Sequence, residues 1–390
     1  SARFALPLSR LALDPGDAIR LQHGGVETRM RVVSVGDGDS RAVEVVREDL
    51  AAYDQPAGPP RPAALLAAVA FSQPAVAALD LPQLLPTVPA HQPLLAAHTV
   101  PWPGALAVYS SAEGSGWVRR ATIRSPATMG SLVDPLYAAP PHRWDYGNVL
   151  TVELLAGQLA SASEAAVLAG ANALAIAGAG GTWDVVQFCN AELVSERRWR
   201  LTKLLRGQKG TEHAIRNPAP ARASVVLLNT ALTPLPLEVE EVGAPLQLRV
   251  GPAQKPVSDS AFRPLAFTPR GVGLRPWAPD HLSEPWRIGR AGSDLTLRWI
   301  RRSRIPSADS WDSVEVPLGE DAEAYRLEIM DGAAVVRTFE TSAPAVTYTA
   351  AQQSADWGAP LSRGSSIEVR LRQISQAVGD GFPLITTIQI

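Results

Sequence analysis

Two groups of cationic residues, each centred on a tryptophan, have the types and spacing best suited to binding chemistry. The group around Trp199 consists of Arg197, Arg198, Arg200, Lys203 and Arg206, and the group around Trp299 of Arg298, Arg301, Arg302 and Arg304. A guanidinium binds carboxylates and phosphates through paired hydrogen bonds and stacks on aromatic rings. The clusters therefore suit an anionic partner: DNA, a cell-surface polysaccharide or the acidic face of a neighbouring subunit. The competing interpretation is a solvated strand face with salt bridges inside the chain.

The glycine-rich residues 178–181 (GAGG) raise the question of a phosphate-binding loop. Such a loop follows a strand, opens a helix and presents backbone amides to the anion. Here residues 182–186 (TWDVV) follow, and their composition is that of a strand. We therefore predict a hairpin turn at this position.

Histidines and the single cysteine do not form a recognisable metal or catalytic pattern. The histidines are His23, His91, His98, His142, His213 and His281. A zinc site needs three or four converging ligands, and these residues lack ligand spacing. Cys189 has a strand-like position, so we predict a small buried hydrophobic residue there.

Carboxylates give no stronger signal. Glu315, Glu320, Asp321 and Glu323 cluster around Gly319, but their spacing is not that of an EF-hand, so we expect solvated loop charge. Paired glycosidase carboxylates cannot be recognised from spacing alone. Candidates for such a pair are Glu113, Asp134, Asp145 and Glu153.

The composition is that of a folded chain rich in turns. Hydrophobic residues make up 46%, charged residues 19%, and the formal net charge is −2, so no global charge favours nucleic acid or anionic lipid. The 34 prolines and 30 glycines indicate short strands with many turns. No apolar run reaches the roughly 18 residues that span a bilayer. The chain opens at Ser1 without a methionine, and we expect it to be part of a longer polypeptide.

Two consecutive strands must position the first cationic group. Residues 183–191 (WDVVQFCNA) are apolar on both faces of a period of two, which predicts a strand buried in a sheet. The cationic residues 198–207 follow as a second strand. Gly207 and Gly210 then bracket a tight turn, where glycine takes positive φ without strain.

This stretch also carries a resemblance. Residues 201–212 (LTKLLRGQKGTE) resemble the LxxLLRGxxGTE signature of phage tail-tip and baseplate hub proteins, most closely the large "megatron" tail protein of gene transfer agents. Further pieces agree in the same order over most of the chain: LDPGD at 13–17, PWPG at 101–104, GAN at 170–172, WIRRSR at 299–304 and QIS at 373–375. Thr202 and Lys203 depart from the pattern, which often has small residues there.

Turn signals and the resemblance together predict a mainly β, multidomain chain. The resemblance implies that residues 1–55 are the C-terminal part of a hub β-barrel whose other strands come from elsewhere. A proline-rich spacer at 55–62 leads into a β-rich middle domain, 56–233, which carries the LLRGxxGTE motif. Residues 234–280 read as an extended proline-rich connector. Residues 281–390 resemble a fibronectin type III β-sandwich with a tryptophan buried in an early strand.

The resemblance implies a structural role at the distal end of a phage-like tail. Such a protein forms a homotrimer, contacts other tail and baseplate proteins, closes the tail tube, attaches to a bacterial surface receptor or glycan, and opens for DNA, which passes without sequence-specific contacts. We predict no catalysis, cofactor or metal in these residues, and a position at the tail tip of a virion-like particle assembled in the bacterial cytoplasm. The residues expected at interfaces or in the structural motif are Leu204, Leu205, Arg206, Gly207, Gly210, Thr211, Glu212, Trp299, Arg301, Arg302 and Arg304.

A second hypothesis is a carbohydrate-binding or carbohydrate-cleaving module with an accessory β-sandwich. It requires an exposed tryptophan platform, for which Trp117 and Trp357 are candidates, or two converging carboxylates. Most of the ten tryptophans lie in strands or beside prolines, where packing is the default. The two hypotheses overlap if a tail tip recognises a surface glycan.

Overall fold

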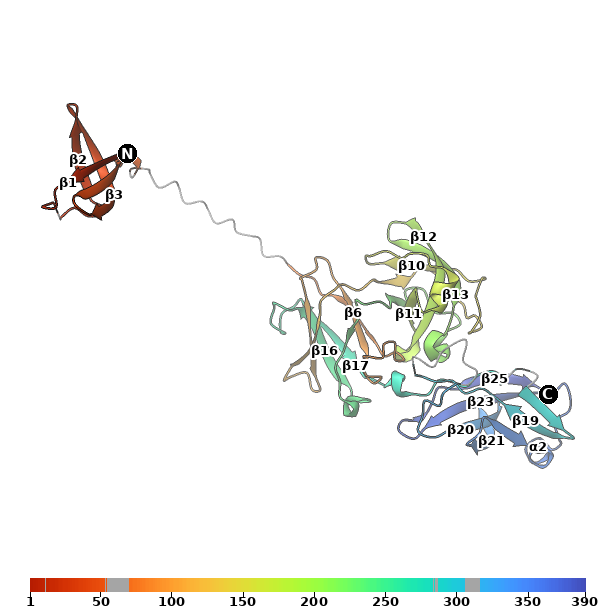
Figure 1. Cartoon of the computed structure of the whole chain (residues 1–390). Helices are drawn as coiled ribbons and strands as arrows, with labels where there is room; N and C mark the ends of the chain where they lie inside the picture. Colours follow the sequence, from red (N-terminus) through yellow and green to blue (C-terminus); the bar gives the residue numbers. More distant parts are fainter. Residues whose placement is uncertain (11, 53, 55–69, 283, 285–286, 306–315) are drawn as a thin grey trace. The chain divides into compact units, whose positions relative to one another are not determined.

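The computed structural model describes residues 1–10, 12–52, 54, 70–282, 284, 287–305 and 316–390. The predicted spacer at 55–62, Glu315, Trp286 and Trp311 lie outside these residues. The chain forms two compact units, Ser1–Val69 and Ala70–Ile390, which are described separately (Figure 1). Antiparallel strands build both units, so the predicted mainly β, multidomain fold is confirmed.

The first unit is a four-stranded antiparallel sheet in the order β1-β4-β3-β2. Its strands are β1 (Ala2–Leu6), β2 (Ala18–His23), β3 (Val26–Asp37) and β4 (Arg41–Arg47), followed by a 3₁₀ turn at Leu50–Ala52. Met30 and Val32 on β3 pack with Val43 on β4 because alternate residues of a strand share a face. Arg29 and Arg31 on the opposite face bind the carboxylate of Glu48.

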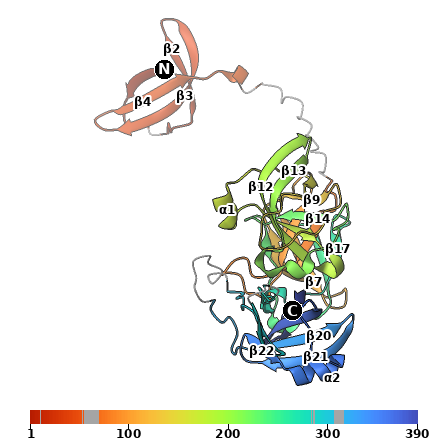
Figure 2. The same cartoon turned by 90° about the vertical axis from the view of Figure 1, so that its right-hand side faces the viewer.

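The second unit contains a closed six-stranded barrel, in the order β10-β13-β12-β11-β14-β9 (Figures 1 and 2). Its strands are β9 (Met129–Leu132), β10 (Leu150–Leu154), β11 (Ala173–Ala177), β12 (Trp183–Ser195), β13 (Arg198–Leu205) and β14 (Ser224–Leu227). Leu150, Phe188 and Leu201 are among the buried residues of its core. Helix α1 (Glu164–Leu168) precedes β11, and its N-cap is Ser163, whose side chain accepts the Ala166 N–H.

Two smaller sheets accompany the barrel, in the orders β15-β6-β5 and β17-β16-β7-β8. Their strands are β5 (Ala75–Leu79), β6 (Leu94–His98), β7 (Leu106–Ser111), β8 (Val118–Ile123), β15 (Thr233–Pro234), β16 (Leu246–Pro252) and β17 (Arg263–Phe267). Strand β17 was not predicted, because Pro264 argues against a strand in sequence. The structure tolerates this proline because β17 is the terminal strand of its sheet, where a missing N–H costs little.

The last part of the second unit consists of two antiparallel sheets around one core. They run in the orders β18-β19-β22 and β21-β20-β23-β24, with β25 also pairing with β23. Their strands are β18 (Ile288–Ala291), β19 (Asp294–Arg298), β20 (Tyr325–Asp331), β21 (Ala334–Thr341), β22 (Ala345–Tyr348), β23 (Ser366–Ser375), β24 (Gly379–Asp380) and β25 (Leu384–Gln389). Trp299 is 2% exposed in this core. Its ring packs edge-on against the Tyr325 ring, with the ring centroids 5.2 Å apart. Helix α2 (Ala350–Trp357), between Thr349 and Gly358, was not predicted.

Candidate functional site at the 206–212 turn

Arg206, the residue after β13, is fully buried and forms a salt bridge with the carboxylate of Asp184 on β12. Its Nη2 and Nε lie 2.7 Å and 3.1 Å from Asp184 Oδ2, and its Nη1 donates to the Tyr137 carbonyl oxygen at 2.8 Å. The Gly207 N–H donates to the other carboxylate oxygen at 3.0 Å. A buried charge is tolerated only when it is paired and hydrogen-bonded. Arg206 therefore locks the turn to β12 from inside the protein.

Each of the two glycines of the turn combines a positive φ with a neighbour that leaves no room for a Cβ. Gly207 has φ +63°, and a Cβ there would lie 2.9 Å from the Glu212 Cα. Gly210 has φ +79°, and its Cβ would lie 2.5 Å from the Trp277 ring, which is nearer than atoms can pack. Thr211 completes the turn, because its Oγ1 accepts the Val185 N–H at 2.9 Å.

Glu212 connects the turn to the segment that follows β19. Its Oε1 accepts a hydrogen bond from Arg302 Nη1 at 2.7 Å, and the Arg302 guanidinium lies 5.0 Å from the centroid of the Trp277 ring. His142 Nε2 lies 3.5 Å from Glu212 Oε1 and 3.4 Å from Asp280 Oδ2. The barrel turn and the second arginine group, which are remote in sequence, thus meet at one partly buried junction.

His213 adds an aromatic contact to this junction. Its ring stacks on Phe382 with centroids 3.6 Å apart and planes 5° apart. Burial lowers the pKa of His213 below its ordinary value. Burial and then the nearby Arg302 charge lower the pKa of His142, against the opposing effect of Glu212 and Asp280. The junction therefore favours neutral imidazoles.

The other predicted motif residues are packed or paired within the chain. Leu204 lies in the barrel core, and Leu205 packs with Cys189, which is buried as predicted. Arg301 donates to the Val316 carbonyl oxygen at 2.7 Å and to Glu323 at 3.3 Å. Arg304 binds Glu320 at 2.7 Å.

Salt bridges also engage the cations around Trp199. Arg198 binds Glu153 at 3.2 Å, and Arg200 binds Glu192 at 3.4 Å. Both arginines lie on β13. Arg198 is directly opposite Glu153 on β10, and Arg200 is directly opposite Glu192 on β12. Most cations of both groups therefore form salt bridges within the chain. Contact with an external anion stays a prediction.

Sequence reasoning missed the partners that make this site. The sequence did not predict a site role for five of them: Asp184, His142, Trp277, Asp280 and Phe382. Asp184 did carry a signal, because it is the charged residue in an apolar strand and a buried charge demands a partner. The acidic cluster carried another, since Glu320 and Glu323 are partners of Arg304 and Arg301 rather than solvated loop charge.

The glycine-rich turn and the metal-ligating residue types were the other candidates for chemistry. Residues Ala179–Gly181 form the 3₁₀ turn between β11 and β12, so the predicted hairpin turn is confirmed. Within the described ranges, no three His, Cys, Asp or Glu side chains are grouped so that they could hold a metal ion. No helix in the described part of the chain is long and apolar enough to cross a membrane.

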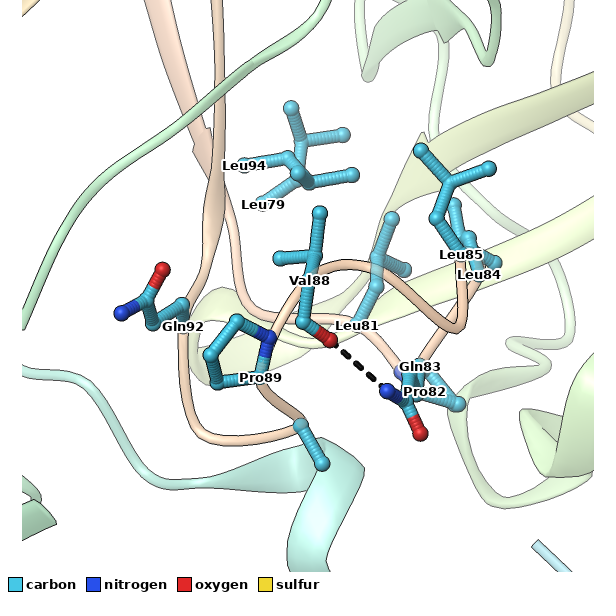
Figure 3. Close-up of a pocket in the computed structure, with 11 residues that line it drawn as sticks. Leu79, Leu81, Pro82, Gln83, Leu84, Leu85, Val88, Pro89, Gln92 and Leu94 are labelled. Carbon is cyan, nitrogen blue, oxygen red and sulfur yellow. Dashed lines mark hydrogen bonds between the residues drawn. The ribbon is translucent and has the colours of Figure 1, made fainter. Parts of the chain in front are cut away.

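A small apolar pocket lies beside β5 and β6 (Figure 3). Leu79, Leu94 and Val88 converge on it, and Gln83 Nε2 closes its rim by donating to the Val88 carbonyl oxygen at 2.7 Å. Its volume of about 10 Å³ has room for one water molecule. This pocket is a packing defect rather than a ligand site.

Two family models match parts of the chain. Residues 127–226 match the model described as "Rcc01698-like, C-terminal", a range that covers the barrel strands from β9 to β14 and includes the 206–212 turn. Residues 1–35 match the model described as "Putative phage tail protein". No curated protein matches the chain. The chain is thus similar to a phage tail protein family in its first unit and to an Rcc01698-like C-terminal domain in its second.

Proposed function

We propose that this protein is a structural component of the tail tip or baseplate of a gene transfer agent or long-tailed phage. Its role is to help close the tail tube, attach the particle to the host surface and open for DNA delivery. The observation that carries the proposal is the match of residues 1–35 to a phage tail family. The ordered motif resemblance over most of the chain supports it, as does the second match, which covers the barrel with the LLRGxxGTE turn.

The first unit supplies a means of assembly. Strands β1 and β2 terminate its open sheet, and terminal strands present N–H and C=O groups to an added strand. We propose a homotrimer in which this sheet completes a hub barrel with strands from elsewhere. The predicted division at 1–55, 56–233, 234–280 and 281–390 and the fibronectin type III character of the last part belong to the same proposal.

The second unit acts as a rigid spacer in this proposal. Most cations of its two tryptophan-centred groups are paired with carboxylates of the same chain, which supports a mechanical rather than catalytic role. We propose that the chain is not an enzyme, needs no cofactor, and contacts other tail proteins through surfaces outside the 206–212 turn.

Electron microscopy of intact particles tests this function. The protein carries a label on the C-terminal sandwich, and the label is located in averaged images. Label in threefold density at the tail tip supports the proposal. A protein that sediments as a monomer and is missing from purified particles overturns it.

A further inference from the structure

An open groove lies on the sheet β17-β16-β7-β8, away from the 206–212 turn. Its volume is about 310 Å³, and its lining includes Trp117, Glu113, Gln247, Arg249 and Pro264. This volume is at the lower end of the range of small-molecule sites, roughly 300–1,000 Å³. The groove is thus large enough for one or two sugar rings.

The sheet register explains why polar side chains gather there. On β16, Leu248 and Val250 are fully buried in the core beneath the sheet, so Gln247 and Arg249 project from the opposite face. Gln247 is opposite Ser111 of β7, and Arg249 is opposite Tyr109. The sheet therefore offers an amide and a guanidinium on one outer face.

Trp117 and Arg249 form a preorganised pair in the groove. The guanidinium carbon lies 5.0 Å from the centroid of the indole ring, and Arg249 Nη1 donates to the Val257 carbonyl oxygen at 3.0 Å. The ring holds the guanidinium by a cation–π contact. A guanidinium has five N–H donors, so one bond to Val257 leaves capacity for a ligand.

A fixed turn carries the carboxylate of the groove. Ser111 Oγ accepts the N–H groups of Glu113 at 3.2 Å and Gly114 at 2.9 Å, and it donates to the Ser115 carbonyl oxygen. Gly114 and Gly116 have φ of +82° and +63°, which glycine adopts without strain. Glu113 is exposed and lines the groove together with Trp117.

These groups match the chemistry of an uncharged sugar. The C–H face of a pyranose packs on an indole ring, while hydroxyl groups donate to a carboxylate and accept from a guanidinium or amide. The Glu113 charge opposes the phosphates of nucleic acid or an acidic polymer. Glu113 is also the one carboxylate among the lining residues of this groove, whereas glycoside cleavage uses two.

We propose that the Trp117 groove binds a neutral oligosaccharide of hexose or N-acetylhexosamine units, without cleaving it. The inference rests on the proposed function for its biological setting, because a tail tip that contacts a cell surface meets such glycans. The groove itself is argued only from the geometry above.

Calorimetric titration of the purified full chain with chitotriose and with maltotriose tests the proposal. We expect saturable binding of at least one probe, at least tenfold weaker binding by Trp117→Ala, and retention of most affinity by Trp117→Phe. Glu113→Gln should weaken binding severalfold. Tyr137→Ala, which removes an exposed aromatic ring elsewhere in the same unit, is the control and should bind as the wild type does.

Thermal unfolding of each variant confirms that it is folded before it is scored. Absence of saturable binding by the wild type, or equal affinity of the wild type and Trp117→Ala, overturns the proposal. Preferential binding of an anionic polymer such as heparin also overturns it. Sugar binding by a chain that is missing from particles would support the groove proposal and refute the tail role. A labelled tail tip without sugar binding would support the tail role and refute the groove proposal.

Discussion

Glu212 and Arg302 lie 90 residues apart in the chain and form an ion pair of 2.7 Å. Glu212 is the last residue of the LLRGxxGTE motif, and Arg302 lies in the segment that follows β19 and contains Trp299. Arg302 also stacks on Trp277, which closes over Gly210. The spacing of the motif thus has a physical basis in this chain: it holds the barrel turn against the start of the sandwich.

Breaking this pair should destabilise the second unit. Both side chains are mostly buried, so Glu212→Gln should lower the free energy of unfolding by about 2 kcal/mol, the worth of a hydrogen bond between charged groups. Every tryptophan lies beyond residue 101, so tryptophan fluorescence during urea unfolding reports on the second unit alone. A double-mutant cycle with Arg302→Met should give a clear coupling energy. Additive effects would show that the pair contributes nothing.

Gly210→Ala should lower the free energy of unfolding by more than the strained backbone angle alone explains. The substitution adds a strained positive φ and drives a Cβ into the Trp277 ring, so we expect a loss above about 2 kcal/mol. Gly243→Ala is the matched control, because Gly243 has a similar φ of +87° but open space around its Cβ position. Urea unfolding of both variants measures the difference. Equal losses would mean that Trp277 moves aside freely.

The buried Arg206–Asp184 pair should tolerate no change of either partner. Asp184→Asn leaves the guanidinium buried without a carboxylate, which costs about 3–5 kcal/mol. Arg206→Lys keeps the charge but loses the fork that reaches Asp184 and Tyr137 together. Arg200→Lys, in an exposed pair with Glu192, should change stability by less than about 1 kcal/mol. Similar effects at positions 200 and 206 would contradict the buried role.

Stability should fall as the pH drops below the ordinary histidine pKa of 6.5. The folded-state pKa values of His142 and His213 are lowered, so the unfolded chain takes up these protons first, and acid favours unfolding. The loss of stability begins near pH 6.5 and continues until the pH has fallen below the folded-state pKa values. His213→Phe keeps a ring against Phe382 and should flatten the decline between about pH 7.5 and about pH 5. Tryptophan fluorescence during urea unfolding at several pH values measures this decline, and an unchanged slope in His213→Phe would refute this cause.

Local sequence patterns predicted many of the strands and turns. The apolar period of two predicted the buried strand β12, and the glycines predicted the turns. These features depend on neighbours in sequence. The partner of Arg302 could not be predicted, because an ion pair between distant segments leaves no local pattern. Strand β17 was missed because Pro264 breaks a strand everywhere except at the edge of a sheet, and edge position is a property of the fold.

The most direct test of the proposed role is electron microscopy of intact particles with the C-terminal sandwich labelled. The account predicts threefold label density at the distal end of the tail tube. A soluble monomer that is absent from purified particles would contradict it.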